Sequence, residues 1–390
     1  DAITTAPYNT AVGYSALSAN TTGDGRNTAI GRAALSATTT GNLNTAVGMN
    51  AGESVTTGVQ NTLIGGLAGD AITTANNNTA VGQAALSATT TGGSNVAIAT
   101  NALGSNTTGG ANVAIGQDTL YANTTASNNT AVGHNALDAN TTASNGTAVG
   151  SNALGSNTTG ALNTAVGSSA LANNTTGAYN VAMGFAALQL NTTAYDNTAF
   201  GYAALNATTT GASNVAMGSG AGASVTTGAT NVIIGYKAGY YTNALTTGTD
   251  NTIIGAYTRS SSATVDAEIV IGRFALGQGT LTATLGNTGN GATINIDGSD
   301  TSWAAHSDQR LKENITTSTA GLSFVNDLRP VTYTWKAKNA ISEDFTNYYD
   351  ADSTDPVNGV AGKTYHGFVA QEMKATIDAH SEVANGNNLW

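Results

Sequence analysis

Two side chains in the C-terminal quarter of the chain, Ser307 and Lys312, are of types that together can cleave a peptide bond. A serine hydroxyl is a weak nucleophile and needs a positioned base. A lysine amine can be that base when burial lowers its pKa towards neutrality. The two residues are five positions apart, and this spacing does not by itself establish contact. Taken alone, they favour a structural interpretation in which Ser307 caps a helix and Lys312 lies on its surface.

The surrounding sequence changes that balance. Three blocks follow one another: Ser-Asp-Gln-Arg-Leu-Lys-Glu-Asn-Ile at 307–315, Gly-Leu-Ser-Phe-Val-Asn-Asp-Leu-Arg-Pro-Val-Thr-Tyr-Thr-Trp at 321–335, and Tyr-His-Gly-Phe-Val-Ala-Gln-Glu at 365–372. In this order they resemble the C-terminal intramolecular chaperone of phage tail spikes and fibres, including endosialidase tail spikes. The resemblance covers residues 307–390.

The resemblance implies a domain that trimerises, guides the folding of the β-structured fibre before it and then cuts itself off. In that family cleavage occurs just before the serine of the first block. Carried over, the scissile bond is His306–Ser307, Ser307 is the nucleophile and Lys312 is the base. With all three blocks present, this dyad is favoured over helix capping. The only enzyme activity expected is intramolecular auto-proteolysis, with no external substrate.

One feature departs from the family pattern. The family usually continues past its third block into a long helix that forms a coiled coil. Here the chain ends at Trp390 with no heptad pattern. We therefore expect the chaperone to be truncated in this chain.

Other chemistry-bearing residues form no recognisable site. The four histidines, His134, His306, His366 and His380, have no metal-ligand spacing. Carboxylates in the first 250 residues are rare and far apart, so they predict no glycosidase pair. The chain has no Cys, which excludes disulfide and thiolate sites. We predict no cofactor-binding site and no metal site.

The part of the chain that precedes the three blocks is built on a seventeen-residue repeat. Each copy opens with Asn-(Thr/Val)-Ala-(Val/Ile/Met)-Gly, and we number its positions as slots 1 to 17. A fixed short period of this kind indicates a stacked solenoid rather than a globular domain. The sixteen copies start at Asn9, Asn27, Asn44, Asn61, Asn78, Asn95, Asn112, Asn129, Gly146, Asn163, Asn180, Asn197, Asn214, Asn231, Asn251 and Glu268.

Each copy reads as two short β-strands that end in turns, because apolar, β-rich segments are followed by Gly. Slots 9 and 12 compensate for each other. Most copies have Leu at slot 9, but four have Gly there, and three of these four have Val or Ile at slot 12. Both slots should therefore face one thin core. The copy with Gly239 is the exception, and we expect Tyr240 and Tyr241 to replace the missing side chain beside Thr242.

So small a core per coil predicts self-association. The Ala residues at slots 3 and 8 would let a second backbone approach closely, so we expect a homotrimer with a shared apolar seam. Sixteen coils at ~4.8 Å each would make a rod on the order of 75 Å long. Asn at slot 1 should form a ladder of side-chain amides. The repeat is similar to the head repeats of trimeric autotransporter adhesins, which form parallel β-rolls, and to repeats in phage fibres.

Composition restricts the range of partners. The net charge is -11 with no basic cluster, which argues against nucleic acid. No apolar run approaches the ~20 residues of a membrane span, so no membrane insertion is expected. Residue 1 is Asp, which suggests a fragment or a processed chain. We divide the chain into a β-roll shaft at 1–278, a β-strand neck at 279–306 and a chaperone domain of mixed α and β structure at 307–390.

These features favour a virion structural protein: a mainly β, homotrimeric phage tail fibre, located extracellularly on the virion. Its expected partners are two further copies, other tail proteins bound through a missing N-terminal part, and a host surface glycan or protein. The alternative is a bacterial trimeric surface adhesin with a β-roll head. A third hypothesis, a polysaccharide-degrading tail spike, needs clustered carboxylates.

Overall fold

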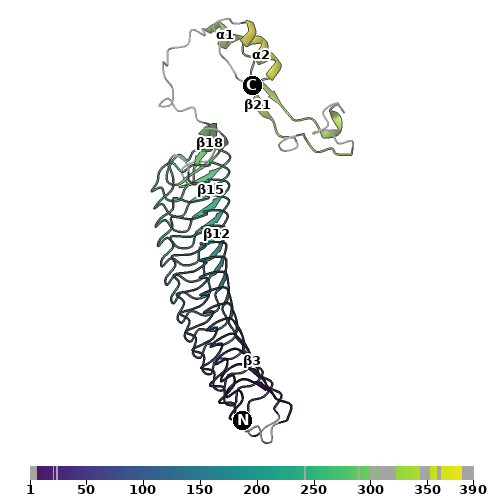
Figure 1. Cartoon of the computed structure of the whole chain (residues 1–390). Coiled ribbons are helices and arrows are strands. Elements are labelled where there is room, and N and C mark those ends of the chain that lie inside the picture. Colours follow the sequence, from purple (N-terminus) through teal and green to yellow (C-terminus); the bar gives the residue numbers. More distant parts are fainter. Residues whose placement is uncertain are drawn as a thin grey trace. The chain divides into compact units, whose positions relative to one another are not determined.

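Figure 1 shows a computed structural model of the chain. The chain divides into two compact units, Asp1–Ser307 and Asp308–Trp390, and each is described by itself. No helix in the described ranges has the length and apolar character needed to cross a membrane. The structure describes residues 7–20, 22, 25–240, 243–287, 290–298, 304–305, 322–342, 352–357 and 362–379.

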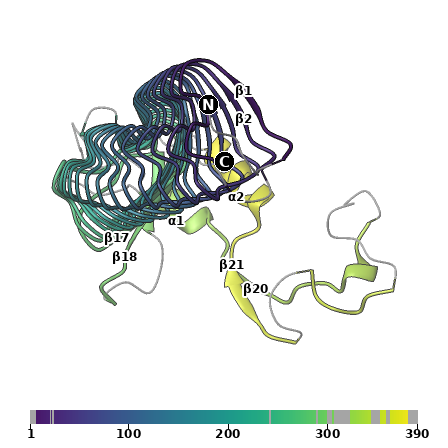
Figure 2. The same ribbon diagram turned by 60° about the horizontal axis from the view of Figure 1, so that its bottom comes forward.

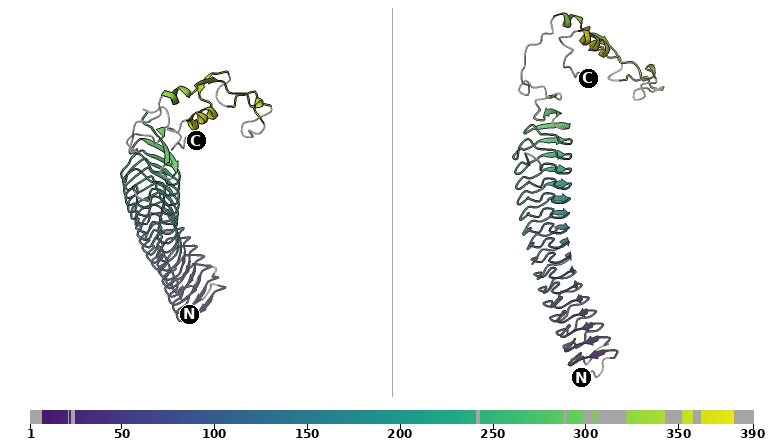
Figure 3. Two further views of the ribbon diagram at one scale, coloured as in Figure 1. Left: turned by 90° about the horizontal axis from the view of Figure 1, so that it is seen from above. Right: turned by 45° about the horizontal axis from the view of Figure 1, so that its top comes forward.

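The N-terminal unit is a parallel β-solenoid, as the repeat predicts. Its described part stacks sixteen strands of three residues, one per coil (Figure 3). Each strand pairs in register with the strand of the next coil, so that Thr130 lies opposite Thr147. The strands are β1 Thr10–Val12, β2 Thr28–Ile30, β3 Thr45–Val47, β4 Thr62–Ile64, β5 Thr79–Val81, β6 Val96–Ile98, β7 Val113–Ile115, β8 Thr130–Val132, β9 Thr147–Val149, β10 Thr164–Val166, β11 Val181–Met183, β12 Thr198–Phe200, β13 Val215–Met217, β14 Val232–Ile234, β15 Thr252–Ile254 and β16 Ile269–Ile271.

The irregular copies keep the same register. Thr10 lies opposite Thr28 and Val232 lies opposite Thr252, so steps of eighteen and twenty residues are absorbed outside the strands. Figure 2 looks more nearly along the stack and shows successive coils laid over one another. In fifteen of the sixteen coils a glycine at slot 5 follows the strand, and in the coil that starts at Asn95 this residue is Ala99. Gly133, for example, has φ +131, and a Cβ there would come within 2.6 Å of the Gly150 carbonyl oxygen in the next coil.

The second strand predicted for each coil is absent from the described coils. In the coil that starts at Asn129, slots 7 and 9 hold Asn135 and Leu137 at φ +55 and +52, so the backbone cannot extend. Coils are still joined there by backbone hydrogen bonds. The Leu137 N–H donates to the Ala153 carbonyl at 3.0 Å, and Thr141 donates to Thr158 at 3.1 Å. The stacking was predicted correctly, but the strand geometry was not.

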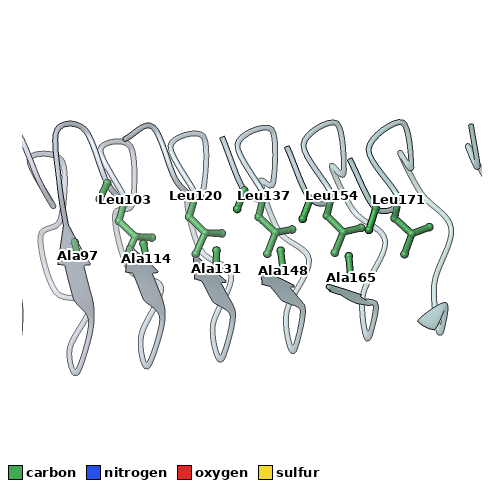
Figure 4. Packing of buried hydrophobic residues seen from close by; sticks show 14 of the residues in the cluster. Ala97, Leu103, Ala114, Leu120, Ala131, Leu137, Ala148, Leu154, Ala165 and Leu171 are labelled. Atoms are coloured by element: carbon green, nitrogen blue, oxygen red, sulfur yellow. The ribbon is translucent and has the colours of Figure 1, made fainter. Parts of the chain in front are cut away.

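The core is a single column that runs through the stack. Slot 3 points inward from the strand, and slots 8, 9 and 12 face it, as shown by the buried Ala131, Ala136, Leu137 and Asn140. Figure 4 shows the leucines of slot 9 in one row opposite the alanines of slot 3. The alanines of slots 3 and 8 therefore pack inside their own chain. The expectation that they line a seam between copies is wrong.

The exchange between slots 9 and 12 is confirmed. Val55, Ile72 and Val225 are fully buried in the coils that carry Gly at slot 9. A Cβ built on Gly69 would lie 2.8 Å from the Ile72 Cδ1, so the slot 12 side chain occupies the space that Leu fills elsewhere.

In the coil of Gly239, the replacement is Leu245. Leu245 is fully buried, and its N–H donates to the Gly239 carbonyl at 3.0 Å. Val55 makes the same bond to Gly52 in its own coil. Tyr240 is 43% exposed, so the expectation that it fills the core is wrong; Tyr241 and Thr242 lie outside the described residues. The three additional residues of this copy shift slot 12 by three positions.

The predicted asparagine ladder is confirmed at slot 1. The Asn112 backbone N–H and its Nδ2 both donate to Asn95 Oδ1, at 3.0 and 3.2 Å, and Nδ2 also donates to the Ala126 carbonyl at 2.9 Å. Each buried amide thus links two coils and closes its own coil. Gly146 interrupts the ladder, because it donates to Asn129 Oδ1 but has no side chain to offer the next coil.

A second ladder, which was not predicted, lies at slot 12. Buried asparagines there donate from Nδ2 to the Oδ1 of the preceding coil, as Asn123 does to Asn106 at 2.8 Å. The same bond recurs at Asn140, Asn157, Asn174 and Asn191.

The solenoid ends in a hairpin, which lies in the β-strand neck predicted at 279–306. β17 (Thr282–Asn287) pairs antiparallel with β18 (Asn290–Asn295), which pairs with β19 (Ala304–Ala305). β17 also pairs in parallel with β16, so the hairpin continues the solenoid sheet. Beside it, the fully buried Glu268 closes the slot 1 ladder. Its carboxylate accepts hydrogen bonds from the backbone N–H groups of Ser261 and Gly279, at 3.0 and 2.9 Å.

Candidate functional site

The predicted processing site lies outside the described residues. This holds for His306 and Ser307, which form the predicted scissile bond, and for the predicted base Lys312. Their roles therefore stay predictions. The division of the chain into compact units falls between Ser307 and Asp308, one residue beyond that bond.

The described part of the C-terminal unit is small and mixes helix with strand. Its elements are α1 (Leu322–Asp327), β20 (Val331–Tyr333), the short helix η2 (Lys338–Ala340), β21 (Tyr365–Gly367) and α2 (Ala370–Ala379). Pro330 restricts the residue before it to extended conformations, which fits the passage from α1 into β20. α2 contains Ala, Gln, Glu, Met and Lys, which are strong helix formers.

Two of the three sequence blocks are brought together by a short antiparallel sheet. Val331 lies opposite Gly367, Thr332 opposite His366, and Tyr333 opposite Tyr365. The Tyr333 ring stacks on Tyr365 with ring centroids 5.9 Å apart, and it meets Trp335 edge to face at 5.5 Å. Aromatic pairs of this geometry stabilise by about 0.5–1.5 kcal/mol beyond the area they bury.

An ion pair joins the same two blocks. The guanidinium of Arg329 donates from Nε to Glu372 Oε2 at 2.9 Å and from Nη2 to Glu372 Oε1, a bidentate arrangement. The hydrogen bond from Arg329 lowers the pKa of Glu372 below its ordinary value. Both side chains are exposed, so the pair adds little stability but fixes geometry. The two residues are 43 positions apart, and spacing alone could not pair them.

The helices meet as well. α1 contacts α2, and Ile377 of α2 is buried. On the outer side of α2, Lys374 pairs with Asp378 at 2.7 Å, one helical turn away. Among the described residues, no three His, Asp or Glu side chains gather as metal ligands would. The described part of the unit thus holds the second and third blocks together through the β20–β21 sheet and the Arg329–Glu372 pair.

Comparison with known proteins identifies this unit. Residues 307–381 match the family model of the chaperone of endosialidase. The match begins at the serine predicted to follow the cleaved bond. No curated protein and no solved structure matches the chain. A parallel β-solenoid followed by this chaperone fits a protein of the phage tail-fibre type.

Proposed function

We propose that this chain is a homotrimeric tail fibre that mediates attachment to a host cell and is folded by its own C-terminal chaperone. The observation that carries the proposal is the chaperone match at residues 307–381, which follows a sixteen-coil solenoid and its terminal hairpin in the sequence. Parallel stacking requires contacts between residues one full coil apart, so loop closure precedes each stabilising contact. A domain that aligns the chains at one end would supply the starting register.

The proposed processing step is an intramolecular acyl transfer. The Ser307 hydroxyl oxygen attacks the carbonyl carbon of His306 while Lys312 accepts the hydroxyl proton. The amide bond then breaks, the nitrogen of Ser307 takes up a proton and becomes an amine, and the His306 acyl group is held as an ester on Ser307. Water hydrolyses this ester. The products are a rod that ends in the His306 carboxylate and a chaperone that begins at Ser307 with its hydroxyl restored.

The rod's part in attachment is as a stiff spacer. Its coils are joined by backbone bonds and by two asparagine ladders, so bending would break many bonds at once. After release of the chaperone, the β17–β18 hairpin would lie close to the new end, where we place the contact with a host glycan or protein. Other tail proteins would hold the opposite end.

The chaperone requirement can be tested by expressing the full chain beside a chain that ends at His306. The proposal predicts that the full chain gives a trimeric rod by light scattering, whereas the shortened chain stays monomeric or aggregates. Ser307→Ala in the full chain is the control, because it keeps the chaperone while removing the nucleophile, and it should still form trimeric rods. A shortened chain that folds into the same trimer would contradict the proposal.

Attachment needs a separate test. Purified rods added in excess to host cells should slow the adsorption of the virus that encodes them. The matched control is a rod whose hairpin β17–β18 has been replaced by a short glycine-rich turn. Unchanged adsorption in the presence of folded rods would contradict the attachment role without touching the chaperone role.

A further inference from the structure

The outward face of the solenoid sheet is uncharged along its whole length, with an unbroken apolar column at slot 4 and Thr, Val or Ile at slot 2. Since slot 3 of each strand points into the core, slots 2 and 4 point away from it. In β1 to β16, slot 2 is Thr, Val or Ile and slot 4 is Val, Ile, Met or Phe, so this face carries no charged residue. We call these two columns of side chains the outer stripe. In the single chain nine of the sixteen slot 4 side chains are exposed, among them Ile115 at 37%, Val149 at 36% and Met217 at 45%, and the other seven are half-buried.

The outer stripe is large enough for a stable interface. Sixteen strands at ~4.8 Å make it on the order of 75 Å long, and three residues per strand at ~3.3 Å make it about 10 Å wide. The resulting area, roughly 750 Å², is close to the ~800 Å² that each partner buries in a standard protein interface. A contiguous apolar patch of this size on a water-soluble protein marks an interaction site.

Charge placement indicates what covers it. The chain carries a net charge of -11, so two copies repel each other wherever their acidic faces meet. The acidic residues of the coils lie outside the outer stripe, as Glu53, Asp70 and Asp138 do at slot 10. Copies that meet through the stripe bring together only uncharged side chains, which are the apolar residues of slot 4 and the Thr, Val and Ile of slot 2.

Periodicity points to the same partner. The stripe repeats once per coil, with strands in unbroken register from β1 to β16. A surface that fits the outer stripe along its whole length must have the same coil spacing. Another copy of this chain has that spacing, because it has the same repeat.

We infer that the outer stripe, slots 2 and 4 of β1 to β16, is the surface through which copies of this chain pack against each other. The inference rests on the proposed homotrimer and names its seam. The outer stripe thus takes the place of the alanines of slots 3 and 8 as the predicted seam, because those alanines are buried in the core of their own chain. The partner is a second copy in parallel register, so that like coils meet.

The absence of Cys from the sequence makes the seam testable by spin labelling of the full chain. Val149→Cys places a nitroxide on the stripe, and Thr142→Cys places one on the exposed slot 14 of the preceding coil. We expect strong spin–spin broadening for the label at 149 and none for the label at 142. A trimer by light scattering that shows the reverse pattern would overturn the seam and leave the fibre proposal standing. A folded monomer would overturn both the trimer and the seam.

A second pair of variants tests the energetics. Ile115→Lys with Val149→Lys puts two charges on the stripe, and Thr108→Lys with Thr142→Lys puts the same charges at the same separation on slot 14. Both pairs change exposed side chains, so far-UV circular dichroism should stay unchanged. The stripe variant should associate at least tenfold more weakly than the control. Equal association of the two variants would overturn the inference.

Discussion

Leucine at slot 9 adopts an unusual backbone conformation for a large side chain. Leu137 and its counterparts lie near φ +50, a region that costs an L-residue about 1–2 kcal/mol. Burying the leucine side chain returns about 1.5–3 kcal/mol, which offsets that cost. Where glycine takes the slot, as at Gly52 and Gly222, the strain disappears and the side chain must come from slot 12. The repeat thus has two solutions to one packing problem.

This exchange predicts a compensating pair of substitutions. Leu205→Gly should lower the free energy of unfolding by about 2–5 kcal/mol, because it leaves a leucine-sized hole. Adding Thr208→Val should recover a substantial part, since the Gly52 and Gly222 coils use that combination. Thr208→Val alone is the control, and it should destabilise, because it removes the hydrogen bond that the Thr208 hydroxyl donates to the Val225 carbonyl. Denaturant unfolding of the four proteins gives the coupling energy, and purely additive effects would contradict the packing account.

Asp70 predicts a pH dependence with a definite sign. Burial, and secondarily the charge of Glu53, raise the pKa of Asp70 above its ordinary value of 3.8. The folded state therefore binds more protons than the unfolded state between 3.8 and the raised pKa, and stability increases as pH falls through that window. Asp70→Asn should raise the midpoint of thermal unfolding at pH 7, and the gain should vanish below pH 3.8.

A matched variant separates the two causes. Glu53→Gln removes only the repulsion, so its gain at pH 7 should be smaller than that of Asp70→Asn. If Asp70→Asn gave the same gain at pH 7 and pH 3, the assignment of the effect to this carboxyl would be wrong.

At the scale of the elements, the coil depends on buried amides as much as on apolar side chains. Each asparagine of slot 1 satisfies backbone groups of two coils, and buried polar groups that lose their partners cost about 1–3 kcal/mol each. The second ladder at slot 12 follows the same logic over residues 106–191. Asparagine is therefore as much a core residue of this fold as leucine.

Glu268 is the last residue of the slot 1 ladder, and we predict that it stabilises the C-terminal end of the solenoid. Glu268→Ala leaves the half-buried N–H groups of Ser261 and Gly279 without this acceptor, so the last coil and the hairpin should open before the rest of the solenoid. Hydrogen exchange should show faster exchange in β16 to β18 and little change in β3 to β14. Glu53→Ala, a partly exposed carboxylate outside the ladder, is the control. Uniform exchange across all coils would show that Glu268 does not close the end.

The sequence predicts some of these elements and not others, for physical reasons. The period of seventeen fixes the coil and its register, because residues one period apart must stack. It does not reveal the left-handed residue at slot 9, since leucine, as at Leu137, is not a residue that usually marks this conformation, whereas asparagine, as at Asn135 in slot 7, is one that adopts it readily. The role of Leu245 is predictable from the sequence. If the three additional residues of the copy that starts at Asn231 are placed before slot 12, Leu-Thr-Thr-Gly at 245–248 aligns with Val-Thr-Thr-Gly at 55–58. The sequence does not show which way the alanines of slots 3 and 8 point, because a small side chain allows close approach either by another chain or by the chain's own core.

At the scale of the whole molecule, two kinds of sequence are joined. The solenoid has few charges and repeats itself, whereas seven of the twelve Lys and Arg residues lie from Arg310 onward. Motif order identified the chaperone, and the structure brings its second and third blocks together through β20, β21 and the Arg329–Glu372 pair. That pair could not be predicted, because opposite charges 43 positions apart have many alternatives. The dyad itself, Ser307 and Lys312, stays a prediction from the motif.

The measurement that tests the central claim most directly is the mass of the fragments formed by the full chain beside those of Ser307→Ala. Both are purified from expression, denatured by boiling and analysed by gel and mass spectrometry. We predict that the wild type gives a fragment that ends at His306 and a second that begins at Ser307, while Ser307→Ala stays intact. Lys312→Met should also stay intact, and both variants should run as trimers when unboiled. Cleavage of Ser307→Ala at the same bond, or a wild-type chain that stays whole after it has formed trimers, would contradict self-processing by this chaperone.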